Sequence, residues 1–244
     1  MSTKILTIES GGATDAGLVR PGNEDAYLVA PPLYVVADGM GGHRAGEVAA
    51  RLAVTTLSTR APEIALGDAD TLVEALQEAN SIILRASQED ERLRGMATTC
   101  TAALVRGRVA RIAHVGDSRA YHFHEGRLTQ VTDDHSVVAQ LVREGYLTPQ
   151  EAAVHPRRNV IMRALGSIED VEIDTAEAIL DAGDRLLLCS DGLTNCLDDA
   201  AIASLLRDGR DARSTAERLV ERANAAGGPD NITVVIVDVR AMSS

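Results

Sequence analysis

The chain has 244 residues, enough for one large domain or two small ones. Hydrophobic residues make up 45% and charged residues 25%, an ordinary globular composition that excludes wholesale disorder. With 24 lysines and arginines against 36 aspartates and glutamates, the formal net charge is −12, so nucleic acid and anionic membrane surfaces are poor partners. An acidic excess also suits a protein that binds divalent cations, although solubility alone explains it as often.

The cysteines and the apolar runs indicate the compartment. Cys100, Cys189 and Cys196 lie in apolar stretches, which favours buried free thiols in a reducing environment over disulfides. The N-terminal segment has no continuous apolar run of the kind found in signal peptides. The most apolar runs, 185–190 and 232–237, are far shorter than the roughly 20 residues of a membrane-spanning helix. We therefore expect a cytoplasmic protein.

The first part of the chain predicts a strand followed by two helices. Tyr34–Ala37 is a short β-rich run that stops at Asp38 and a glycine-rich loop. Residues 44 to about 59 are rich in Ala and Leu, with Glu47 in the first turn, which is typical of a helix. Residues 70–93 carry apolar side chains at helical spacing and predict a second helix.

The middle of the chain predicts a run of short strands over residues 99–105, 109–115, 120–124 and 127–131. Their connections are too short for a parallel crossover, so neighbouring strands must pair antiparallel. Helical segments are predicted over residues 136–144 and 149–153, strands over 174–178 and 184–189, a helix pair over 199–225 and a last strand over 232–239.

Helices that come in pairs and strands that come in runs disfavour a doubly wound parallel sheet. We predict an α+β fold, an α-β-β-α sandwich of two antiparallel sheets flanked by helix pairs. No linker or low-complexity segment interrupts the chain, so we expect one domain over residues 1–244.

Four aspartates fall where predicted strands meet loops: Asp38, Asp117, Asp191 and Asp230. Any one of them alone is an ordinary turn residue, but four at strand ends can project toward one pocket. Converging carboxylates without a Cys/His set of zinc spacing favour a hard cation, Mg²⁺ or Mn²⁺. Two such ions would hold a shared hydroxide as nucleophile, and the Gly39 carbonyl could also become a ligand.

Several short motifs occur in order along residues 13–239. They are Arg20-Pro-Gly-Asn-Glu-Asp25, Asp38-Gly-Met-Gly-Gly-His43, Thr98-Thr99, Gly116-Asp-Ser-Arg119, Asp133-Asp-His135, Arg163-Ala-Leu-Gly166, Ser190-Asp-Gly-Leu-Thr194 and Asp230-Asn231. Each motif alone is weak, but the ordered set is very specific. It resembles the metal-dependent serine/threonine protein phosphatases of type 2C, in their bacterial form.

The resemblance implies two central Mn²⁺ or Mg²⁺ ions. Asp38 would bridge both ions, and the Gly39 carbonyl would bind the first. Asp191 and Asp230 would hold the second ion.

The resemblance also implies residues around this pair of ions. Glu24 and Asp25 would bind the first ion through water molecules. Asp117 would hold a third, weaker ion together with Asp191. Arg20 would grip the substrate phosphate, because its planar fork can bind two phosphate oxygens at once.

The implied reaction is attack on phosphorus by a hydroxide that bridges the two ions, without a phosphoenzyme. Some eukaryotic members have a histidine two residues after the shared aspartate as a proposed general acid, and this chain has Met40 there. His43 is a possible acid, although a surface-loop role is the better interpretation, and a metal-bound water could protonate the leaving group instead.

Residues 136–164 resemble the mobile flap of bacterial members, which would gate access to the site. The alternative is a pair of surface helices that only pack. His122 and His124 alternate on one predicted strand and share a face that could bind a metal, but exposed strand histidines are far commoner than ligands. We interpret His135 as a loop residue near the base of the flap.

The resemblance implies a phosphatase that acts on phosphoserine and phosphothreonine proteins, with a serine/threonine kinase as its biological counterpart. A non-catalytic regulatory module, a pseudophosphatase, is the alternative, but Asp38, Asp117, Asp191, Asp230 and Arg20 are all present. A metal-dependent hydrolase of small phosphate esters is a third hypothesis, which phosphopeptides and sugar phosphates would separate.

Overall fold

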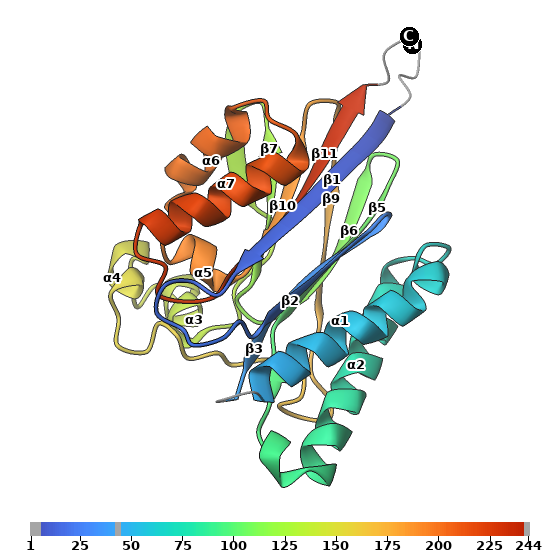
Figure 1. Cartoon of the computed structure of the whole chain (residues 1–244), viewed down its shortest axis with the longest axis vertical. Helices are drawn as coiled ribbons and strands as arrows, with labels where there is room; N and C mark the ends of the chain where they lie inside the picture. The colour runs from blue at the N-terminus through green and yellow to red at the C-terminus, as the bar shows by residue number, and fades with distance from the viewer. Residues whose placement is uncertain (1–5, 42–44, 242–244) are drawn as a thin grey trace.

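Two antiparallel sheets pack face to face in the computed structural model, which describes residues 6–41 and 45–241 (Figure 1). The first sheet has the strand order β1 (Leu6–Asp15), β11 (Ile232–Ala241), β10 (Arg185–Cys189), β7 (Arg119–His124) and β8 (Arg127–Gln130). The second has the order β2 (Asp25–Ala30), β3 (Leu33–Met40), β5 (Cys100–Arg106), β6 (Val109–Val115) and β9 (Asp174–Ile179), and β4 (Ala97–Thr98) pairs with β3.

A helix pair covers the outer face of each sheet. The second sheet carries α1 (Ala45–Ile64) and α2 (Ala69–Glu89), followed by the short 3₁₀ helix η1 (Glu91–Leu93). The first sheet carries α6 (Asp199–Arg207) and α7 (Ala212–Ala225). Figure 1 shows the resulting helix, sheet, sheet, helix order. The predicted α-β-β-α sandwich is therefore confirmed.

Aspartates begin three of these four helices. The side chains of Asp68, Asp198 and Asp211 each accept a hydrogen bond from a backbone N–H in the first turn of α2, α6 and α7.

Across the described part of the chain, no helix is both long enough and apolar enough to cross a membrane.

Alternation along the strands divides the core into three layers. On β3, Val35 packs toward α1 and α2, whereas Tyr34 and Val36 pack between the sheets. On β10, Leu187 packs toward α6 and α7, and Leu188 packs between the sheets. Because successive side chains of a strand point to opposite faces, each central strand must be apolar on both faces to be buried this way.

The sequence prediction misses three strands, β1, β2 and the two-residue β4. In β1 the pair Gly11-Gly12 resembles a turn, yet the strand pairs with β11 along its whole length. A Cβ on Gly11 would lie 2.5 Å from the Arg213 Cα of α7, and one on Gly12 would lie 2.6 Å from the Tyr27 ring. The glycines are there because neighbouring elements approach the strand closely, which the sequence alone does not reveal.

Residues 136–164 form α3 (Val137–Arg143), α4 (Pro149–Ala153) and turns beside the first sheet. Thr148 and Glu151 form a capping box at the start of α4. An isolated bridge pairs Ser136 with Ile161, so the two ends of this segment meet. The two predicted helices are confirmed, and movement of the segment as a flap remains a prediction.

Candidate metal centre

Asp25 and Asp38 are direct partners across the β2–β3 pair, so two carboxylates share one register position. Like charges placed opposite each other destabilise a strand pair. The Asp25 Oδ2 atom accepts a hydrogen bond from the Ser190 hydroxyl at 2.8 Å, whereas its Oδ1 atom is buried without a hydrogen-bond partner. Desolvation and the nearby carboxylates of Asp191 and Asp230 raise the pKa of Asp25 to about 7.

The backbone of Asp38 is fixed by two threonines. Its N–H donates to the Thr99 hydroxyl at 3.0 Å, and its carbonyl accepts from the Thr98 hydroxyl and the Thr99 N–H, both at 2.9 Å. Asp38 lies inside β3 rather than just after its end, because the strand continues to Met40. Desolvation and repulsion from Asp25 and Asp191 hold the pKa of Asp38 well above its usual range.

Asp191 and Asp230 reach the same place from the first sheet. Asp191 follows β10 and opens the short helix α5 (Asp191–Thr194), and its Oδ2 atom accepts from the Asn195 amide at 3.0 Å. Desolvation and the Asp230 carboxylate raise the pKa of Asp191. Asp230 precedes β11, and its Oδ1 atom accepts from the Asn231 N–H at 2.9 Å.

Asp117 completes the group from the turn between β6 and β7. Desolvation, followed by repulsion from Asp191 and Asp134, raises the pKa of Asp117 to about 8, and its Oδ1 atom is buried without a hydrogen-bond partner. The preceding Gly116 has φ +110°, and the Cβ of another residue there would lie 2.5 Å from the Thr99 side chain. Only glycine therefore suits this turn.

Gly39 lies where two backbone segments nearly touch it. A Cβ at this position would lie 2.6 Å from the Glu24 carbonyl and would also collide with the Gly46 carbonyl. The backbone N–H of Glu24 donates to the Asn231 side chain at 2.8 Å, which ties this segment to the start of β11. Glycine is required here by packing, whatever its carbonyl binds.

Arg20 lies at the edge of the carboxylate group. Its Nη2 atom is 2.6 Å from the Asp230 Oδ2 atom, and about half of its side chain (53%) is exposed. This hydrogen bond raises the pKa of Arg20 further. The guanidinium thus faces both solvent and the carboxylates, as a group that binds an incoming anion would.

These residues fit divalent hard cations. All of the predicted side-chain ligands are carboxylates, and oxygen ligands are what Mg²⁺ and Mn²⁺ prefer. Buried oxygens of Asp25 and Asp117 lack hydrogen bonds, and buried polar atoms without partners are costly. Burial, followed by repulsion between neighbouring carboxylates, raises the pKa values of Asp25, Asp38 and Asp117, and either protons or cations would relieve this repulsion.

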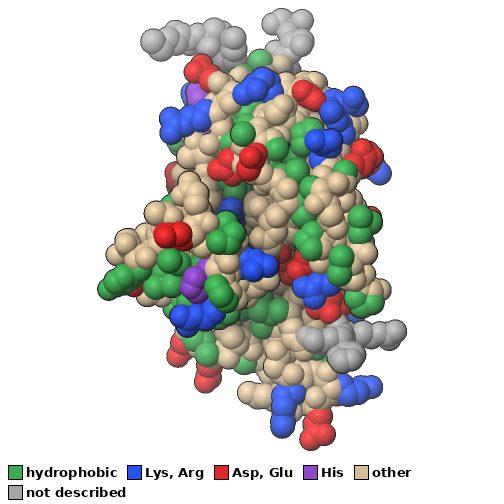
Figure 2. All heavy atoms as spheres, turned by 90° about the vertical axis from the view of Figure 1, so that its left-hand side faces the viewer, with side chains coloured by type: hydrophobic (Ala, Val, Ile, Leu, Met, Phe, Trp, Pro, Cys, Tyr) green, Lys and Arg blue, Asp and Glu red, His purple; other side chains and the backbone are tan. Residues whose placement is uncertain are grey.

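A groove of about 930 Å³ leads away from Asp117 and Asp191. One of its walls is formed by α3, α4 and the turn at Arg158, and the other by α5 and the start of α6. Figure 2 faces this side of the molecule and shows acidic and basic side chains interspersed around a hollow beside a projecting lobe. The predicted flap segment therefore borders the carboxylate group.

Several supporting residues have no role in the sequence prediction beyond their place in the motifs. Asn231 holds the segment before β2, since its amide donates to the Ala16 and Gly22 carbonyls at 2.9 and 2.8 Å. His135 is buried and exchanges hydrogen bonds with both backbone groups of Gly116. The motifs Asp230-Asn231 and Asp133-Asp-His135 mark these residues, but only the fold shows what they hold.

The remaining candidates lie elsewhere. His43 falls outside the described residues. His122 and His124 do share one face of β7, and both bind the Asp184 carboxylate. All three cysteines are free, as predicted; Cys100 and Cys189 are buried and Cys196 is half-buried. Desolvation raises the pKa of Cys189 to about 12, so its thiol is a poor nucleophile.

Comparison with known proteins decides the family. The family model described as protein phosphatase 2C matches residues 22–233, most of the chain. The chain belongs to the protein phosphatase 2C family. The resemblance expected from the motifs is confirmed.

Two similar members of the family come from bacteria. The serine/threonine protein phosphatase PstP of Mycobacterium tuberculosis is 43% identical over 240 residues, which are 98% of this chain and 46% of that protein. The serine/threonine phosphatase stp of Listeria monocytogenes is 41% identical over 235 residues, 92% of this chain and 93% of that protein. The chain thus spans about half of the mycobacterial relative and nearly all of the Listeria one.

Solved structures of the family share the fold. The Mycobacterium tuberculosis PstP/Ppp structure superposes with a TM-score of 0.90 at 42% identity, covering 96% of this chain and 99% of that one. A second structure, the PstP catalytic domain in complex with two manganese ions, has a TM-score of 0.89 at 41% identity with the same coverage.

Proposed function

We propose that this protein is a metal-dependent phosphatase of phosphoserine and phosphothreonine residues in proteins. The observation that carries the proposal is a group of aspartates from both sheets in which burial, followed by mutual repulsion, raises the pKa values of Asp38 and Asp117. Within this group, buried oxygens of Asp25 and Asp117 lack hydrogen-bond partners. Such a set needs cations, and the related PstP catalytic domain was solved with two manganese ions. Phosphatase relatives of similar length support the reaction.

We assign two Mn²⁺ or Mg²⁺ ions to this centre. In this assignment Asp38 would be shared by both ions, the Gly39 carbonyl would bind the first ion, and Asp191 and Asp230 would hold the second. Glu24 and Asp25 would hold water molecules around the first ion. When bound, such ions lower the pKa of water and neutralise charge on a phosphate group. Asp117, with Asp191, would hold a weaker third ion.

Arg20 is the proposed anchor of the substrate phosphate. The guanidinium already contacts Asp230 through one nitrogen and is half exposed, so it can bind a phosphate oxygen while it stays beside the carboxylates. Charge-assisted hydrogen bonds of this kind are worth roughly 1.5–3 kcal/mol. The guanidinium would also orient the phosphorus toward the attacking group.

The attacking group in this proposal is a hydroxide derived from water, and no phosphoenzyme forms. Ser190 and Cys189, which precede Asp191, are poor alternative nucleophiles. The Ser190 hydroxyl donates to Asp25 and accepts from the Thr233 N–H at 2.9 Å. The Cys189 thiol is fully buried, and its pKa is about 12.

Protonation of the leaving alcohol is assigned to water, with His43 as the second candidate. Met40 stands where some eukaryotic relatives have a histidine, and methionine cannot donate a proton. A water held at the metal centre would supply this proton without His43.

The groove beside the centre is the proposed path of the substrate polypeptide. Residues 136–164 form one wall, so movement of this flap would change access to the phosphate site. We propose further that residues 1–244 act as a single catalytic domain and that a serine/threonine kinase is among the substrates, which rests on the family resemblance alone.

A direct test compares phosphate release from a phosphothreonine peptide and from a sugar phosphate with added Mn²⁺. The proposal predicts turnover of the peptide and at least tenfold lower kcat/KM for the sugar phosphate. Preference for the sugar phosphate would favour the small-ester hydrolase. Absence of turnover on both, with metal bound, would favour the pseudophosphatase.

A further inference from the structure

A second cluster of possible metal ligands lies at the other end of the first sheet. His122 and His124 alternate on β7, and Asp184 immediately precedes β10. Phe123 is opposite Arg185 in this antiparallel pair. The next position along therefore brings Asp184 opposite His124. Because paired positions share a face, the three side chains converge. Their ligand atoms all lie within 4.8 Å of one another.

The cluster is anchored on one side and open on the other. The Asp184 side chain is only 3% exposed, and its Oδ2 atom accepts from the Asp181 N–H at 2.8 Å. His122 and His124 are 20% and 45% exposed, so an ion can reach their rings from solvent. Asp191 follows β10 at its far end, which separates this cluster from the proposed metal centre by the length of the strand.

Each imidazole already points a ring nitrogen at the carboxylate. His122 Nε2 lies 2.8 Å from Asp184 Oδ2, and His124 Nδ1 lies 2.7 Å from Asp184 Oδ1. A carboxylate only accepts hydrogen bonds, so in this state both nitrogens carry a hydrogen. Although burial opposes it, the bonds from Asp181 and the histidines lower the pKa of Asp184, which keeps the carboxylate ionised at neutral pH.

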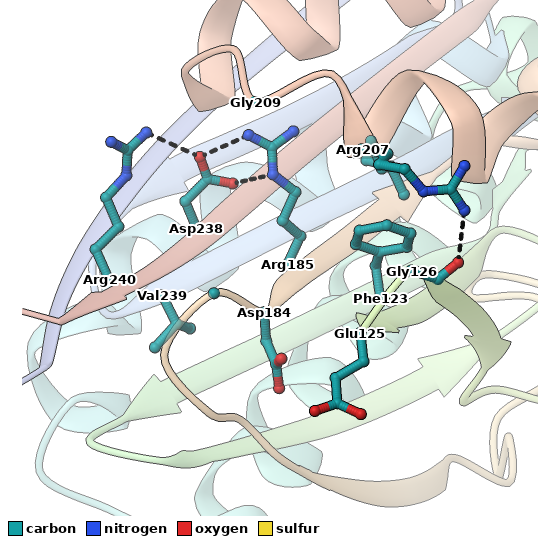
Figure 3. Close-up of a pocket in the computed structure, with 12 residues that line it drawn as sticks. Phe123, Glu125, Gly126, Asp184, Arg185, Arg207, Gly209, Asp238, Val239 and Arg240 are labelled. Carbon is teal, nitrogen blue, oxygen red and sulfur yellow. Dashed lines mark hydrogen bonds and ion pairs between the residues drawn. The ribbon is translucent and has the colours of Figure 1, made fainter.

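A second carboxylate adds negative charge beside the cluster. The Glu125 carboxylate is 3.9 Å from the other ring nitrogen of His124, Nε2. Figure 3 shows the Asp184 and Glu125 carboxylates on the same side of a hollow of about 560 Å³, directed away from the cluster of Arg185, Asp238 and Arg240. When His124 Nδ1 binds a metal, Nε2–H faces a carboxylate, as in many metal sites where a ligating histidine donates its other N–H.

We propose that His122, His124 and Asp184 form a site for a divalent transition metal of the Zn²⁺ type. Two imidazoles and one carboxylate are a ligand set that suits Zn²⁺, whereas the oxygen-only centre suits Mn²⁺ or Mg²⁺. Binding replaces the hydrogens on His122 Nε2 and His124 Nδ1, which move to the other ring nitrogen or to solvent. Water fills the remaining coordination position, so the site is open.

A bound ion at this place would cross-link β7 to the turn before β10. Beside the backbone pairing of β7 with β10, the two hydrogen bonds to Asp184 already link these segments. Since an ion that binds only the folded state stabilises it, Zn²⁺ should raise the Tm of the wild type more than that of a variant without the histidines.

The test is a count of bound Zn²⁺ by equilibrium dialysis in excess Mg²⁺, which occupies the carboxylate centre. Wild type, H122A, H124A and Asp38→Asn are compared, with His155→Ala as a control that removes a half-buried histidine just after α4, outside the cluster. Wild type, His155→Ala and Asp38→Asn should each retain a Zn²⁺ ion that H122A and H124A lose. Equal counts in wild type and both histidine variants would overturn the proposal.

A second measurement needs no variant. The imidazole ¹⁵N resonances of the wild type are recorded with and without one equivalent of Zn²⁺. The proposal predicts that the signals of His122 Nε2 and His124 Nδ1 change from protonated to metal-bound nitrogen while Asp184 stays ionised. Unchanged tautomers at both rings would show that the three side chains only form hydrogen bonds with one another and do not bind Zn²⁺.

Discussion

At the scale of single residues, the pairing of two buried carboxylates across neighbouring strands requires an explanation. Asp25 and Asp38 face each other across two strands, and repulsion from Asp25 adds to burial in raising the pKa of Asp38. A protein without cations would be more stable with a neutral residue at one of these positions, because unpaired buried charge is costly. The fold keeps both, which is expected if the charges exist for ligand binding.

Replacing Arg20 with alanine should lower kcat/KM on a phosphothreonine peptide by about tenfold or more, the loss of a charge-assisted contact of roughly 1.5–3 kcal/mol. If Arg20 binds the phosphate equally in ground and transition states, the change appears in KM; if its contact tightens later, kcat falls too. Steady-state kinetics of the purified variant give both values.

Arg20→Lys should fall between wild type and alanine, because lysine keeps the charge and loses the planar fork. Arg92→Ala, which removes an 88% exposed arginine paired with Asp90, is the matched control and should be neutral. An unchanged kcat/KM in Arg20→Ala would remove Arg20 from the site.

Asp117→Ala should separate the proposed third ion from the central pair. Asp38, Asp191 and Asp230 are untouched, so calorimetric titration with Mn²⁺ should still find two tight ions. Turnover should nevertheless fall sharply, since a weakly held ion with few protein ligands depends on each of them. A folded variant with two tight ions and near-normal kcat would make Asp117 a structural residue only.

The sequence predicts which aspartates gather at the candidate metal centre, but it does not predict the residues that position them. The aspartates could be found because carboxylates beside glycines recur at strand ends and in ordered motifs. The roles of Thr99, Asn231 and His135 could not, since each acts through a hydrogen bond to a backbone group distant in sequence. A hydroxyl or amide in a loop carries no signal of the partner that it will meet.

At the scale of elements, the close approach of β1 and α7 explains the glycines that conceal the first strand. The backbone of Arg213 lies where a Cβ on Gly11 would be placed. Strand prediction from sequence depends on side chains that pack on a pleated surface. At Gly11 this strand has no side chain, because the backbone of α7 occupies that space. Elements with ordinary patterns, such as β5, β6 and α2, were predicted within a few residues.

Gly11→Ala should therefore destabilise the protein by about 1–3 kcal/mol, the usual cost of forcing extra volume into a packed site. Gly22→Ala is the matched control, because nothing lies within 4 Å of a Cβ there. Urea unfolding of both variants provides the comparison. Equal stability of Gly11→Ala and Gly22→Ala would show that α7 adjusts without cost.

For the whole molecule, the important fact is that the carboxylates come from both sheets. Asp25 and Asp38 belong to β2 and β3, whereas Asp191 and Asp230 flank β10 and β11 of the other sheet. Ions bound between them would join the two halves of the sandwich. The layered sandwich could be predicted from the paired helices and short connections, but the strand order and the meeting of these strand ends could not, because they depend on how the sheets assemble and stack.

Saturating Mn²⁺ should consequently raise the Tm of the wild type, and EDTA should reverse the change. An ion present at 100 times its Kd stabilises the folded state by about 2.7 kcal/mol. Thermal unfolding of wild type and Asp38→Asn, each with Mn²⁺ and with EDTA, measures the effect. A stabilisation of Asp38→Asn as large as that of the wild type would place the ions elsewhere.

The most direct test of the account is phosphate release from a phosphothreonine peptide by wild type and Asp38→Asn, each with Mn²⁺ and with EDTA. Asp208→Asn, which changes an exposed aspartate paired with Arg218, serves as the matched control. We predict turnover by wild type and Asp208→Asn only with Mn²⁺, and a loss on the order of 100-fold or more in folded Asp38→Asn. Turnover in EDTA, or full turnover by Asp38→Asn at saturating Mn²⁺, would contradict a metal-dependent reaction at these carboxylates.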